Sequence, residues 1–247
     1  MAVIAIERIK TTRNWILYAV LTFLIALNLA SGVRNYLNNR LVYEEQGVTW
    51  LALWGQSGLL FAFFCLPIVI SVRAAMAVRV ENENHNWRRM ASYDAAVNPV
   101  YRSKIASLLL FCGACQLLYL ALFLATGILL GFDPGPGLVG RFVLWGLGGW
   151  VGSCAVALVQ FYAALRTASV ASAVTVGVLG TIGGFILTVV FPFLGTVFPY
   201  TQIGAGMRVR ALDSFTGTEA MAFLAVNLAL VVGFALAGAR YVQRREY

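Results

Sequence analysis

The charged residues of this 247-residue chain are separated by six long stretches that contain no Asp, Glu, Lys or Arg. A helix that crosses a bilayer needs roughly 20 mostly apolar residues, and each stretch is at least that long. The strands of a membrane barrel would alternate apolar and polar residues, which runs such as 108–111 do not. The pattern predicts an all-α integral membrane protein with six transmembrane helices. These spans are expected near residues 15–33, 50–72, 105–131, 142–165, 168–191 and 220–239.

The longest charge-free stretch, residues 167–207, is interpreted as one span followed by a segment that does not cross the membrane. Pro192 and Pro199 divide it, and a proline inside a helix costs about 3 kcal/mol. Residues 192–219 are therefore expected not to span the membrane, and an ordinary external loop is the simplest interpretation. Their glycines and prolines break helical backbone, and such backbone is tolerated at membrane depth only when it is buried in protein or lines water.

Composition and charge narrow the functional class. Hydrophobic residues make up 60% of the chain and charged residues 11%, whereas a typical soluble domain is about 25% charged. Soluble enzymes, nucleic-acid-binding domains and disordered chains are thereby excluded. Thirteen of the 18 basic residues lie in 1–14, 73–104, at Arg166 or in the tail from Arg240. By the positive-inside rule both termini are predicted to be cytoplasmic, so the net charge of +8 reports topology.

Few residues offer site chemistry. The six stretches contain no ionisable Asp, Glu, Lys, Arg or His, and the single histidine, His85, lies in a predicted cytoplasmic loop. There is no GxxxxGK[ST] phosphate loop and no recognisable Ser-His-Asp arrangement. Catalytic, cofactor and metal sites are therefore not expected in this chain, which favours a conduit or scaffold over an enzyme.

Uncharged polar residues inside the spans are either interhelical hydrogen-bond partners or contacts along a substrate path. Pairs of glycines four residues apart in the fourth and fifth spans predict close backbone approach. The glycine pairs are Gly148 with Gly152 and Gly180 with Gly184, and the polar residues are Asn28, Gln56, Gln116, Gln160 and Asn227.

The loop 73–104 is the most polar part of the chain. Its first residues favour helix, so the second helix is expected to continue past the span, and Asn98-Pro99 predicts a turn. Trp87, Met90 and Ala91 share one helix face, and Arg88 and Arg89 lie largely on the other. Such a short amphipathic helix suits a groove on a cytoplasmic partner, whereas a solvated loop with positive anchors is the simpler interpretation.

The run Glu81-x5-Trp87-Arg88-x-Met90, followed by Pro99-Val100-x-Arg102-x-Lys104-Ile105, resembles the loop between helices two and three of ABC type-2 exporter permeases. The length, the six spans and the absence of a nucleotide site match that family as well. Within it, the chain most resembles the lantibiotic-immunity and bacitracin-resistance subunits. The spacing from Trp87 to Pro99 is longer than the family pattern.

The resemblance implies residue roles. Residues 73–104 would carry a coupling helix, with Glu81 at the interface to an ATPase and Trp87, Met90 and Ala91 in its groove. Arg88 and Arg89 would meet its acidic rim or lipid headgroups. Residues 1–14 would be a cytoplasmic interface segment, and 192–219 would hold the re-entrant hairpin.

The resemblance also implies a function. The chain would be the permease subunit of an ATP-driven exporter in a bacterial cell membrane, moving an amphipathic peptide, an antibiotic or a lipid-like molecule. ATP and Mg would be bound by a cytoplasmic ATPase in two copies, and a second permease, identical or homologous, would complete the path. An ATP-independent secondary transporter or channel is the alternative, as is a membrane anchor or assembly subunit.

Overall fold

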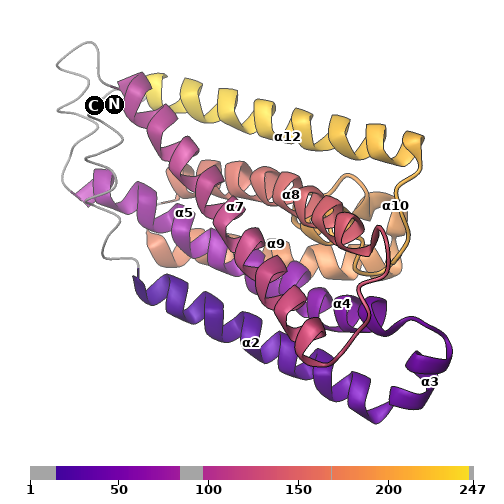
Figure 1. Cartoon of the computed structure of the whole chain (residues 1–247). Coiled ribbons are helices and arrows are strands. Elements are labelled where there is room, and N and C mark those ends of the chain that lie inside the picture. Colours follow the sequence, from indigo (N-terminus) through magenta and orange to yellow (C-terminus); the bar gives the residue numbers. More distant parts are fainter. Residues whose placement is uncertain (1–14, 84–96, 168, 245–247) are drawn as a thin grey trace.

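The computed structural model describes residues 15–83, 97–167 and 169–244 (Figure 1). In these ranges the chain is helical without strands, and six helices are long and apolar enough to cross a membrane. The six-helix prediction is confirmed. The long helices are α2 (Trp15–Asn38), α4 (Thr49–Leu60) continued by η2 (Phe61–Cys65) and α5 (Leu66–Glu83), α7 (Val97–Leu129), α8 (Leu138–Arg166), α9 (Val170–Val190) and α12 (Gly217–Arg244).

The second and third long helices extend beyond the charge-free stretches. α5 continues to Glu83, as expected from the helix-favouring residues after position 72. The predicted turn at Asn98-Pro99 is wrong, because α7 begins at Val97. Proline is tolerated in the first turn of a helix, where its missing N–H would have no intrahelical partner.

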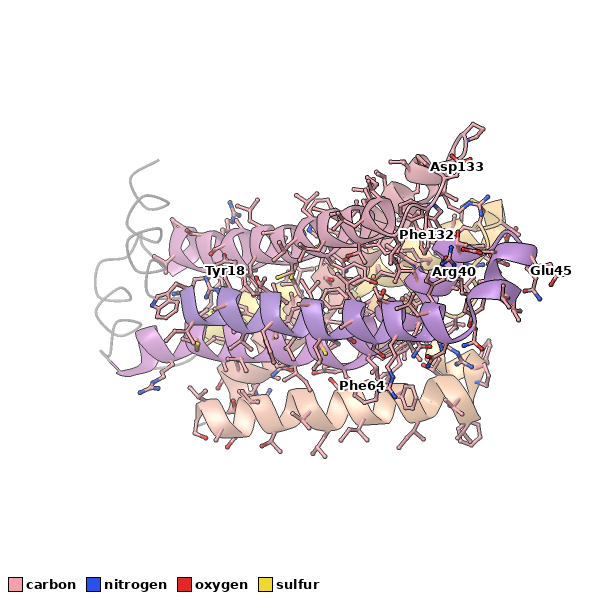
Figure 2. The ribbon with its side chains drawn as sticks, turned by 60° about the horizontal axis from the view of Figure 1, so that its bottom comes forward. Tyr18, Arg40, Glu45, Phe64, Phe132 and Asp133 are labelled. Atoms are coloured by element: carbon pink, nitrogen blue, oxygen red, sulfur yellow. The ribbon has the colours of Figure 1, made fainter. Side chains whose placement is uncertain are left out.

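The ends of the helices fall into two groups. Figure 1 shows the start of α2, the end of α5, the start of α7 and the end of α12 at one end of the bundle, here called the terminal end. The short helix α3 (Arg40–Glu45) lies at the opposite, distal end. In Figure 2, Tyr18 marks the terminal end and Asp133 the distal end. The segment 84–96 therefore connects two helices at the end that also holds both outer helix termini.

α8 is the central helix of the bundle. It packs against α5, α7, α9 and α12, and over half of its most apolar window is buried. α12, by contrast, has 6% of its window buried and presents large apolar side chains such as Leu228 and Leu236 to the outside. An unpaired apolar helix surface of this extent is stable in lipid, where apolar side chains carry no penalty for exposure.

Candidate functional site

Residues 192–212, here called the fold-back segment, return into the bundle between α9 and α12. They form three short turns: α10 (Pro192–Gly195), η3 (Pro199–Thr201) and α11 (Gln202–Gly206). Each proline begins a turn, where its fixed φ angle fits and its missing N–H costs nothing. The expected hairpin is thus a segment folded into the protein, while its depth in the bilayer stays a prediction.

The fold-back segment reaches far along α8. The Tyr200 hydroxyl donates a hydrogen bond to Oε1 of Gln160 at 2.6 Å. Gln160 lies 22 residues after Leu138, the first residue of this 29-residue helix. At 1.5 Å per residue the contact is about 33 Å along a helix of about 43 Å. The fold-back segment therefore occupies the middle of the bundle and does not cover its distal end only.

Glycines of α8 make room for this backbone. A Cβ atom on Gly148 would stand 2.5 Å from the carbonyl oxygen of Gly206, and one on Gly152 would overlap the carbonyl of Gln202. On α9, a Cβ on Gly180 would overlap the Tyr200 ring. The predicted close approach of backbones is confirmed for the α8 glycines, whose partner is the fold-back segment, whereas the α9 glycines Gly180 and Gly184 make room for the side chains of Tyr200 and Phe198.

One buried amide joins three elements. Gln160 of α8 accepts from Tyr200 of the fold-back segment, and its Nε2 donates to the carbonyl of Ala173 in α9 at 2.5 Å. The Gln160 side chain is fully buried. Because both ends of the amide are used, the residue ties the helices together and is a helix-contact residue.

A second buried amide pair joins the fold-back segment to α12. Nδ2 of Asn227 donates to Oε1 of Gln202 at 2.9 Å. Nε2 of Gln202 donates to the carbonyls of Thr196 and Phe198, each at 2.9 Å, and so closes the turn that carries it. A second polar contact of α12 with this segment, the ion pair of Glu219 with Arg208 at 3.6 Å, lies nearer the surface, so Asn227 is the buried polar contact.

Where the fold-back segment faces α4 and α7, one short hydrogen bond holds it and the other polar contacts are long. Nε1 of Trp54 donates to the carbonyl of Met207 at 2.8 Å in a fully buried position. Nε2 of Gln116 has only long contacts, 3.5 Å to Oγ of Ser153 and 3.6 Å to Sδ of Met207. Among the described residues, Oε1 of Gln116 and Oδ1 of Asn227 are buried without a hydrogen-bond partner.

The other two predicted polar residues lie elsewhere. Asn28 is buried in α2, where its Nδ2 donates to the carbonyl of Leu24 at 2.7 Å and approaches Sγ of Cys65 at 3.4 Å. Gln56 is exposed. Of the five predicted residues, three therefore surround the fold-back segment. Tyr200, Gln202 and Trp54 were missed, although a glutamine in a charge-free segment shortly after a proline is a usable signal.

Two cations are buried between α5 and α7, directly outside the charge-free spans predicted at 50–72 and 105–131. The helices are longer than the charge-free stretches and therefore include Arg73 and Lys104. Nζ of Lys104 donates to the carbonyl of Ala77 at 3.1 Å, and the Arg73 guanidinium donates to Oγ of Ser107 at 3.2 Å. Both side chains are over nine-tenths buried, so the two helices are fastened together near the terminal end.

The chain matches the family described as ABC-2 family transporter protein over residues 3–184, about three quarters of its length. It belongs to this ABC-2 family. Searches of curated proteins and of solved structures gave no match. The family supports a membrane transport component, in agreement with the six apolar helices. Among the described residues no cluster of His, Cys, Asp and Glu could hold a metal ion.

The predicted coupling residues of this ABC-2 protein lie at or beyond the edge of the described ranges. The backbone of Glu81 is in the last turns of α5. Trp87, Arg88, Arg89, Met90 and Ala91 lie outside the described residues, as does the predicted interface segment 1–14. Their roles stay predictions, and the geometry given above concerns the helices that flank them.

Proposed function

We propose that this ABC-2 protein is the permease subunit of an ATP-driven exporter, coupled through residues 73–104 to a separate ATPase subunit. The match over residues 3–184 carries the proposal, since it covers five of the six long helices in whole or in large part. The exporter would move an amphipathic peptide, an antibiotic or a lipid-like molecule. Lantibiotic immunity or bacitracin resistance is the expected biological setting.

The geometry of α5 and α7 supports coupling. Both helices reach the terminal end, and the segment between them is 84–96. The buried contacts of Lys104 with Ala77 and of Arg73 with Ser107 hold the two helices together below that segment. Movement of the loop would therefore move α5 and α7 together.

ATP and Mg would be bound by the partner ATPase. The amphipathic helix of the coupling loop would lie in a groove on that partner.

The distribution of basic residues supports a cytoplasmic position for the terminal end. Arg79, Arg102, Arg166 and Arg240 belong to it, whereas the distal end has Arg34, Arg40, Arg141, Arg208 and Arg210. With Arg73, Lys104 and Arg244, seven of the described basic residues belong to the terminal end. The other six basic residues lie in 1–14, in 84–96 or at Arg245, segments that the sequence assigns to the same side, so the total is 13 of 18. Under the positive-inside rule both termini are then cytoplasmic, in a bacterial cell membrane.

The exposed apolar faces support a partner permease and a substrate from the bilayer. α2, α9 and α12 each bury under a third of their most apolar window in one chain. Lipid covers such faces, and a second permease, identical or homologous, would cover part of them. The apolar part of an amphipathic substrate could pack on these faces, because they carry no charged side chain that the substrate would leave buried and unpaired.

The test is affinity purification of a tagged chain from its native membrane. We expect a cytoplasmic ATPase to co-purify and to be lost when Glu81→Ala and Trp87→Ala are combined. Leu41→Ala with Glu45→Ala, both on α3 at the distal end, is the matched control and should retain the ATPase. Equal recovery of the ATPase with all three proteins, together with unchanged ATP-driven transport, would show that the coupling assignment is wrong.

A further inference from the structure

The second long helix contains one π turn, and its sequence explains why. In η2 the N–H of Leu66 bonds to the carbonyl of Phe61, five residues back. Pro67 follows directly, so it has no N–H to donate and its ring would clash with the carbonyl of Phe63, four residues back. A π turn relieves that conflict, and single π turns inside helices are frequent at functional sites.

The π turn directs Phe63 into the fold-back segment. Phe63 is buried, and a Cβ on Gly204 of α11 would stand 2.5 Å from its ring carbons Cε2 and Cζ. Only a glycine at position 204 leaves space for this ring. The neighbouring Phe61 stacks on Tyr119 of α7 with ring centroids 4.3 Å apart, which fixes the distal side of the turn.

We propose that Phe63 is a positioning residue for transport, which transmits movement of α5 to the fold-back segment through its contact with Gly204. The inference rests on the proposed function, because α5 leads without interruption to Glu83, within the proposed coupling loop 73–104. An α-helix turns 100° per residue, so loss of the extra residue of the π turn would rotate α5 relative to α4 by about 100°. The Phe63 ring would then leave Gly204, and the fold-back segment would lose its support on that side.

The neighbouring Phe64 supplies a matched control from the same π turn. Its ring lies 5.0 Å from that of Phe185 in α9, and Figure 2 shows it between α2 and α9. Phe64→Leu therefore disturbs the turn without touching Gly204. Phe63→Leu removes the ring at Gly204 and keeps an apolar side chain.

The experiment is hydrogen–deuterium exchange on the permease–ATPase complex in lipid nanodiscs, with and without ATP and vanadate. The amides of residues 192–212 should change their exchange rate with nucleotide in the wild type and in Phe64→Leu. In Phe63→Leu, and in Gly204→Ala, that change should fall at least threefold while ATPase binding is retained. The double variant Phe63→Leu with Gly204→Ala should regain at least half of it, because the smaller side chain leaves room for the added methyl group.

Each other result has a defined meaning. A nucleotide-dependent change in Phe63→Leu equal to that of the wild type, or no change in the wild-type complex, overturns this inference and leaves the permease assignment standing. Failure of any ATPase to co-purify with the wild-type chain overturns the proposed function itself. Loss of the response in Phe64→Leu as well would show that the π turn acts through general stability and not through Gly204.

Discussion

Substitution of Gly152 by alanine tests whether the fold-back segment depends on close backbone contact with α8. The added Cβ would overlap the carbonyl of Gln202 and stand 2.7 Å from the backbone nitrogen of Ile203. Both obstacles are backbone atoms, so relief requires α8 and α11 to separate. Overpacking costs about 1–3 kcal/mol, and a buried hydrogen bond left unmade adds about 1–3 kcal/mol. Alanine favours the helix over glycine by about 1 kcal/mol, which offsets part of this cost. The free energy of unfolding should therefore fall by about 3 kcal/mol, within a range of about 1–5 kcal/mol.

The measurement is the free energy of unfolding of the purified chain in mild detergent, obtained by titration with SDS and followed by tryptophan fluorescence. Gly183→Ala is the matched control, because a Cβ at this position of α9 meets nothing within 4 Å. The control should be more stable than the wild type by about 0.5–1 kcal/mol. If Gly152→Ala is as stable as Gly183→Ala, the fold-back segment does not rest on α8 as described.

Two further predictions use the same titration. Trp54→Phe should cost about 1–3 kcal/mol, because the carbonyl of Met207 loses its buried donor. Trp150→Phe should cost less than half as much, because the carbonyl of Leu109 lies inside α7 and keeps its helix hydrogen bond. Equal losses would contradict the role of the bond to Met207. The hydrogen bond from Arg40 lowers the pKa of Glu44 in the folded protein. The ionised pair therefore stabilises the fold above pH values near the ordinary carboxyl pKa of about 4.3. This stabilisation is lost as the pH falls through the lowered pKa of Glu44 in the folded state. Glu44→Gln should therefore reduce the difference in stability between pH 6 and pH 3, and an unchanged difference would contradict it.

The bilayer makes the number of helices readable from the sequence, because each span needs a long stretch without charge. The same signal misplaces the helix ends. A helix continues wherever its backbone can stay hydrogen-bonded, and the buried contacts of Arg73 and Lys104 let α5 and α7 carry charge beyond the apolar stretch. Pro99 was interpreted as a turn although it suits the first turn of a helix equally well.

The candidate site was only partly predictable for a different reason. Gln160 and Asn227 stand out in the sequence as polar residues among apolar neighbours. Their partners, Tyr200 and Gln202, lie in a segment with no periodic pattern, and no local rule states where such a segment returns in space. Pro67 is the local cause of the π turn, but the contact of Phe63 with Gly204 depends on the tertiary fold.

The hydrogen bond between Gln202 and Asn227 can form only after both residues have been synthesised, so it forms late in the folding of the chain. Gln202 precedes its partner by 25 residues, and the partner belongs to α12, which is synthesised after the fold-back segment. Until α12 is inserted, the oxygen of Gln202 lacks this donor, although α8 and α9 are already present to receive the rest of the fold-back segment. A nascent chain that ends before Asn227 would therefore leave the buried Gln202 oxygen without a donor, and the fold-back segment would be fully hydrogen-bonded on this side only after α12 has packed against it.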